Sequence, residues 1–129
     1  MSRLMSVALT EEAVRERCKT VTRRLGWKFL KPGDRLTLCR KVMGRKPGEP
    51  LVRICDVEVV SVRREPLNAV TLGEVQREGF LYFGPSQFIE FFTEHMRCAP
   101  STEVTRIEWR YLDGAQRSGE AVQDSPEAS

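Results

Sequence analysis

Arg17-Cys18-Lys19-Thr20-Val21-Thr22-Arg23-Arg24 is the stretch that indicates the fold of this chain, and Gly26-Trp27 and the turn sequence Lys31-Pro32-Gly33-Asp34 follow it. Four cations and two hydroxyls lie within its eight residues. The β-branched series Thr20-Val21-Thr22 favours extended backbone and predicts a short strand. The Pro-Gly-Asp turn then leads into a further strand.

A helix is predicted just before this strand. Thr10 is followed by Glu11 and Glu12, and a threonine hydroxyl can cap free backbone amides while acidic side chains suit the positive end of the helix dipole. The helix is expected to end near Cys18. Lys19 therefore falls at the junction between helix and strand, where strand alternation does not fix its direction.

Alternation within the strand divides its side chains between two faces. Thr22 and Arg24 share one face with Thr20, and Val21 and Arg23 take the other. We expect Lys19, Thr22 and Arg24 to converge on one pocket.

The chain resembles the ASCH domain, a member of the PUA-like superfamily, over roughly residues 3–112. The resemblance is carried by the pattern Lys19-x-x-Thr22-x-Arg24, the pair Gly26-Trp27, the Pro-Gly-Asp turn, the later Glu78-Gly79-Phe80 and a closing aromatic-rich strand. It implies an α+β domain built on a small PUA-like β-barrel of five or six strands with two or three helices.

The family signature Gly-x-Lys-x-x-Glu-x-Arg differs from this chain at two positions. Arg17 stands where glycine is common, and Thr22 stands where glutamate is common. The threonine version occurs in small ASCH proteins that resemble bacterial N4-acetylcytidine amidohydrolases. That likeness implies that Lys19, Thr22 and Glu78 form a catalytic set without metal or other cofactor.

Composition predicts one domain over 1–112 and a disordered tail over 113–129, because the tail has no aromatic residue and few apolar ones. No apolar run approaches the roughly 20 residues that a membrane-spanning helix needs. The N-terminal residues lack a hydrophobic signal core, which favours a cytoplasmic protein. The cysteines are widely spaced and are expected to be reduced and mostly buried, with no metal site.

Basic residues outnumber acidic ones, 20 to 14, within 1–112. Four of these cations, Arg40, Lys41, Arg45 and Lys46, flank a loop that contains Gly and Pro, and such a cluster attracts polyanions such as single-stranded RNA. An ordinary solvated surface would also account for them.

Periodicity predicts the remaining elements. Strands are expected over 4–8, 35–39, 51–62 and 104–112, the last with only one face buried, and helices over 71–78 and 86–97. Thr71 and Glu74 form a capping box, Gly79 suits a left-handed helix end, and Pro85 suits a first helical position.

Each candidate residue also has a structural interpretation. Lys19 and Arg24 fit solvated cations, Thr22 fits a strand former, and Glu78 fits a purely structural ion pair. Trp27 is equally a core anchor or a surface on which a base stacks. His95 is expected at the protein surface and outside the site.

Two classes of function therefore stay open. In one, Lys19 activates Thr22 or a water for attack on an acylated cytidine, Glu78 transfers protons and Arg24 binds an oxygen of the substrate. In the other, the same pocket binds RNA, with Trp27 stacking on an unpaired base, or cleaves it.

Overall fold

A computed structural model describes residues 2–112 of the chain, and the predicted tail over 113–129 lies outside these residues. Within them are five strands and three α-helices, which confirms the α+β class. The strands are β1 (Arg3–Ser6), β2 (Val21–Arg24), β3 (Arg35–Cys39), β4 (Arg53–Pro66) and β5 (Glu103–Tyr111). The helices are α1 (Glu11–Arg15), α2 (Leu72–Arg77) and α3 (Pro85–Met96), with 3₁₀ turns over Ala8–Thr10 and Leu67–Ala69.

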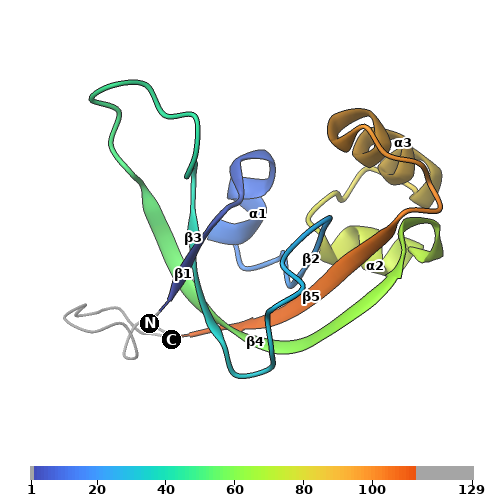
Figure 1. Cartoon of the computed structure of the whole chain (residues 1–129), viewed down its shortest axis with the longest axis horizontal. Coiled ribbons are helices and arrows are strands. Elements are labelled where there is room, and N and C mark those ends of the chain that lie inside the picture. Colours follow the sequence, from blue (N-terminus) through green and yellow to red (C-terminus); the bar gives the residue numbers. More distant parts are fainter. Residues whose placement is uncertain (1, 113–129) are drawn as a thin grey trace.

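The strands form one sheet in the order β1-β3-β4-β5-β2, which leaves β1 and β2 as its edges. β1 pairs with β3 in parallel, and the other neighbours are antiparallel. The long strands β4 and β5 curve, and the sheet curls into a half-barrel with the helices on its concave side (Figure 1). A register shift between Val59 and Ser61 contributes, because a bulge increases the local twist of a strand.

Two apolar clusters fill the concave side. The first lies between α1 and the sheet and includes Met5, Val14, Leu36 and Ile107. The second packs α2 and α3 against the far end of β4 and β5, and consists of Leu67, Val70, Val75, Phe88, Phe92 and Val104. The candidate site lies between the two clusters.

The first helix differs from its prediction. It covers Glu11–Arg15 and does not reach Cys18, because Arg17 adopts a left-handed conformation with φ of 62°. The Thr10 side chain makes no capping hydrogen bond and is instead buried. The segment after the helix runs without regular structure to β2, so Lys19 does lie in a junction.

The strand β5 also differs from its prediction. Val104, Thr105, Arg106 and Ile107 are all buried, so both faces of its first half are covered. Arg106 is buried because Glu74 of α2 accepts hydrogen bonds from it at 2.7 and 3.1 Å. A polar residue in an alternating strand can thus face another layer of protein in place of solvent.

The same contact explains why the capping box of α2 is only half formed. Thr71 Oγ1 accepts a hydrogen bond from the Glu74 amide at 3.3 Å, as predicted. The Glu74 carboxylate, however, binds Arg23 and Arg106 and does not return to the helix start.

Within the described residues, no helix is long and apolar enough to cross a membrane.

Candidate functional site

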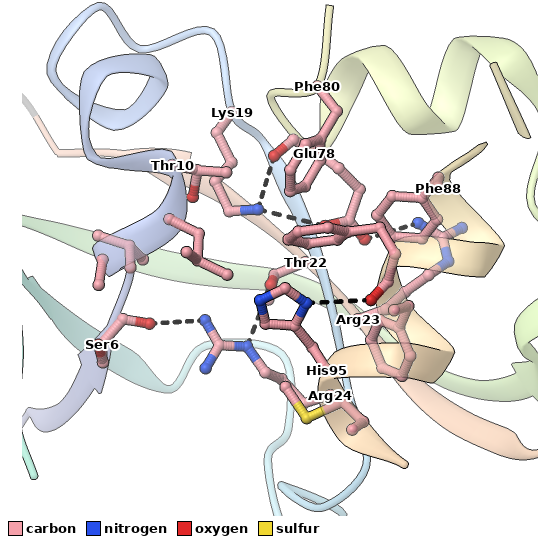
Figure 2. Close-up of a pocket in the computed structure, with 16 residues that line it drawn as sticks. Ser6, Thr10, Lys19, Thr22, Arg23, Arg24, Glu78, Phe80, Phe88 and His95 are labelled. Carbon is pink, nitrogen blue, oxygen red and sulfur yellow. Dashed lines mark hydrogen bonds and ion pairs between the residues drawn. The ribbon is translucent and has the colours of Figure 1, made fainter. Parts of the chain in front are cut away.

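A cavity of about 310 Å³ opens between the start of the chain, β2 and α3 (Figure 2). Polar side chains from β2 and its flanks line one part of it, and aromatic side chains of α3 and the preceding loop line another. Its 16 lining residues are Ser6, Val7, Ala8, Leu9, Thr10, Lys19, Thr22, Arg23, Arg24, Glu78, Phe80, Phe88, Phe91, Phe92, His95 and Met96.

Lys19 is buried at this cavity, with 3% of its side chain exposed. Its Nζ donates to the Glu78 carbonyl oxygen at 2.7 Å and to Glu78 Oε1 at 3.2 Å. The Trp109 indole donates to the Lys19 carbonyl at 3.0 Å, which anchors the junction on β5. Burial lowers the pKa of Lys19, and the nearby guanidiniums of Arg24 and Arg23 act in the same direction, against the opposing effect of Glu78.

Glu78 directly follows α2 and carries its carboxylate between two cations. Oε1 accepts from Lys19, and Oε2 accepts from Arg23 Nη1 at 3.0 Å. An ion pair of Glu78 is therefore present, and its two partners are Lys19 and Arg23. Gly79 follows with φ of +100°, the left-handed helix end that the sequence indicated.

Thr22 and Arg24 both line the cavity, as strand alternation predicted. Arg24 Nε donates to Thr22 Oγ1 at 3.2 Å, and Arg24 Nη2 donates to the Ser6 carbonyl at 2.7 Å. Because the threonine oxygen accepts this bond, its hydroxyl hydrogen stays available for another acceptor. Burial lowers the pKa of Arg24. Arg24 forms no ion pair with any residue of 2–112.

Arg23 is a site residue that sequence reasoning missed. Besides Glu78, its guanidinium contacts Glu65 at 2.9 Å and Glu74 at 2.7 Å, with 1% of the side chain exposed. Glu74 also binds Arg106, and these hydrogen bonds hold the pKa of Glu74 down at about 2. Arg23 lies on the strand face opposite Thr22, and that face of β2 packs against α2. This position in the strand was the one sequence signal that could have indicated its role.

His95 was predicted at the surface, and it lies at the rim of the cavity. Its side chain is exposed, yet it is one of the lining residues. The ring lies tilted against that of Phe91, with 4.2 Å between centroids, and Nδ1 lies 3.2 Å from the Phe91 carbonyl oxygen. The position of His95, four residues after Phe91 on the apolar face of α3, could have indicated this placement.

Trp27 does not line the cavity. It has φ of 62°, packs partly buried against the first apolar cluster and lies 5.5 Å from Phe29 between ring centroids. Among the two interpretations of Trp27, these contacts favour the core anchor.

The basic loop lies between β3 and β4, and none of its four cations lines the cavity. Arg40 pairs with Glu11 of α1 at 3.0 Å, and Lys41 lies 3.7 Å from Glu49. Arg45 donates to the backbone carbonyls of Val42 and Glu49. Figure 1 shows the loop projecting beyond the sheet, on the side away from α3. It is a surface separate from the cavity.

The four cysteines form no disulfide, and only Cys39 is buried, so the expectation of mostly buried cysteines was wrong. Within residues 2–112, no three His, Cys, Asp or Glu side chains gather as metal ligands.

No family model and no curated protein matches the chain. Several solved structures match its fold. A DUF984 protein of Enterococcus faecalis V583 is 15% identical over 88% of this chain and 81% of its own, with a TM-score of 0.63. The ASCH domain of Lactobacillus crispatus JV V101 is 15% identical over 80% of this chain and 70% of its own, with a TM-score of 0.58. An ASCH protein variant of Zymomonas mobilis is 12% identical over 93% of this chain and 82% of its own, with a TM-score of 0.53.

Proposed function

Because the chain has the fold of ASCH domain structures, we propose that it acts on a modified nucleoside or on RNA, and specifically that it is a metal-independent amidohydrolase of an acylated cytidine. The observation that carries this proposal is the meeting of Lys19, Thr22 and Glu78 at one cavity, each nearly buried. These are the residues to which the resemblance assigns catalysis.

The size and lining of the cavity support a ligand of this kind. About 310 Å³ lies at the lower end of the roughly 300–1,000 Å³ typical of small-molecule sites. Phe80, Phe88 and Phe91 offer apolar ring surface to a pyrimidine. Lys19, Thr22 and Arg24 offer polar groups for its acyl and carbonyl substituents.

Lys19 is the base in this mechanism. A neutral amine has two hydrogens and one lone pair, and the two contacts of Nζ with Glu78 account for both hydrogens. The lone pair can then accept the hydroxyl proton of Thr22. Burial favours the neutral amine, since it lowers the pKa of Lys19.

Thr22 is the nucleophile, and its oxygen attacks the acyl carbon. Arg24, which already donates to Thr22 Oγ1, stabilises the developing oxyanion through its guanidinium. Glu78 orients Lys19. The carbon–nitrogen bond breaks, the exocyclic amine leaves with a proton, and water hydrolyses the threonine ester to give cytidine and the carboxylic acid.

RNA binding or cleavage is the second candidate function. The observation that favours it is the exposed basic loop with Arg40, Lys41, Arg45 and Lys46, which lies apart from the cavity and suits a phosphate backbone. In this case the cavity would receive one unpaired base, and no amide would be cleaved.

Incubation with N4-acetylcytidine and, separately, with a mixed pool of RNA tests the two candidates. We expect release of cytidine and acetate by the wild-type protein, and a loss of roughly 100-fold or more in Lys19→Met, which keeps the side-chain length but removes the base. RNA binding or cleavage without amide hydrolysis would support the second candidate and refute the first.

A further inference from the structure

The proposed hydrolysis requires a proton donor for its leaving group. Amide cleavage requires that the departing nitrogen receive a proton, and sequence reasoning assigned this step to Glu78. Both carboxylate oxygens of Glu78 accept hydrogen bonds, one from Lys19 and one from Arg23. A carboxylate held in this way has no proton to give. The proton that Lys19 takes from Thr22 is one source for the departing nitrogen, and an acid on another wall of the cavity would be a second.

His95 lines the cavity from a different element, the last turn of α3. A carbonyl oxygen only accepts hydrogen bonds, so the 3.2 Å contact with the Phe91 carbonyl places a hydrogen on His95 Nδ1. The second ring nitrogen, Nε2, lies on the side of the ring away from that bond and faces the cavity (Figure 2). Imidazole is the side chain best suited to exchange protons in the neutral pH range.

We infer that His95 is a catalytic residue, the general acid that protonates the departing exocyclic amine; the inference rests on the proposed amide hydrolysis. As the Thr22 oxygen bonds to the acyl carbon, its proton passes to Lys19. The bond between acyl carbon and exocyclic nitrogen breaks, and the proton on His95 Nε2 passes to that nitrogen.

The second half of the reaction restores every group. Water attacks the threonine ester and gives one proton to His95 Nε2, while Lys19 returns its proton to the Thr22 oxygen. The acyl group leaves as the carboxylic acid. The sum is one amide and one water converted to one amine and one acid.

The decisive comparison uses two substrates that differ in the need for an acid. N4-acetylcytidine has a poor leaving group, whereas p-nitrophenyl acetate releases an anion that is stable without a proton. We expect His95→Asn to lower kcat for the amide by roughly 100-fold with KM nearly unchanged. The rate of the initial burst of p-nitrophenolate, which reports only formation of the threonine ester, should stay within about twofold of wild type. Glu94→Gln, an exposed neighbour outside the cavity lining, should alter neither.

Equal losses of amide turnover and of the burst rate on the ester, or no loss of either, would overturn the role of His95. A wild-type protein that does not cleave the amide would refute both the proposed hydrolysis and this role of His95.

His95 is the single histidine of the chain, so its imidazole proton resonance also reports binding directly. We expect cytidine to shift that resonance, and an unchanged resonance under saturating cytidine would exclude contact between His95 and the ligand.

Discussion

At the scale of single residues, Thr22 offers the sharpest test of the mechanism, because its shape and its hydroxyl can be changed separately. Thr22→Val keeps the branched shape and removes the nucleophile, so amide hydrolysis should fall by 100-fold or more. Thr22→Ser keeps a hydroxyl and should retain measurable turnover. Rates on N4-acetylcytidine and melting temperatures measure both effects.

Thr37→Val is the matched control for that series. Thr37 is also a buried strand threonine, and it donates a side-chain hydrogen bond to Asp56 at 2.7 Å, outside the cavity lining. Its removal should lower stability with little change in turnover. A Thr22→Val protein as active as wild type would show that Thr22 is not the nucleophile and that water attacks directly.

Glu74 should contribute to the pH dependence of stability. Its pKa is lowered from 4.5 to about 2 in the folded protein, so the stabilisation is complete above about pH 4.5 and is lost as the pH falls toward 2. The shift corresponds to about 3 kcal/mol at most, for a side chain that is 17% exposed.

Glu74→Gln should therefore be less stable than wild type at pH 7, and the difference should shrink as the pH approaches 2. Chemical unfolding at a series of pH values measures this. Glu58→Gln, which removes an exposed ion pair with Arg110, is the control and should cost less than about 1 kcal/mol. A difference for Glu74→Gln that is constant with pH would contradict the assigned pKa.

The sequence predicted part of this site correctly. Lys19, Thr22 and Arg24 meet because a lysine at a junction and two residues on one strand face are local properties. Arg23 was missed because its surroundings are set by distant segments, whereas the spacing of His95 from Phe91 was a local signal. Arg23 meets glutamates from β4 and α2, more than forty residues away, and nothing within its own strand specifies them.

At the scale of elements, Gly79 controls how closely α1 and α2 approach. A Cβ at this position would lie 2.9 Å from Ala13 Cβ and 3.6 Å from Lys19 Cβ. Gly79→Ala therefore adds a steric clash to the strain of a left-handed backbone, and should destabilise by roughly 2–5 kcal/mol in total. Because the clash adjoins Lys19, turnover should fall as well.

Gly33→Ala separates the two contributions. Gly33 has a similar φ of +96°, but a Cβ there would have nothing within 4 Å. Only the backbone strain of roughly 1–2 kcal/mol should appear, with normal turnover. Equal unfolding free energies for the two variants would show that α1 yields to the added methyl group without cost.

Element boundaries followed local signals where these were strong. The strand β3 was predicted at its observed bounds, and Pro85 and Gly79 marked helix ends correctly. The burial of both faces of β5 could not be predicted in the same way. Its alternating pattern is that of a half-exposed strand, and only the packing of α2 places Arg106 in the interior.

At the scale of the whole molecule, the basic loop and the cavity are separate surfaces and can be tested independently. Replacing Arg45 and Lys46 by Ala should weaken RNA binding to all sequences, and each lost phosphate contact should reduce the slope of log affinity against log salt by roughly 0.7. Hydrolysis of a neutral nucleoside should not change.

Replacing Lys28 and Lys31 by Ala is the matched control, since it removes the same charge from the turn between β2 and β3. If this variant loses as much RNA affinity as the loop variant, the effect is one of net charge and the loop is not a specific contact. Binding isotherms at several salt concentrations distinguish these results.

The bond between Arg24 and the Ser6 carbonyl connects β2 with β1, the two outermost strands of the sheet. A molecule bound in the cavity contacts both of these edge strands, because Ser6 and Arg24 both line it. The molecule must therefore dissociate before β1 and β2 can separate. Amide hydrogen exchange of β1 should then report on occupancy of the cavity, although β1 lies four strands from β2 in the sheet. At a concentration about 100 times Kd, linkage predicts roughly 100-fold slower exchange there if opening requires the empty state.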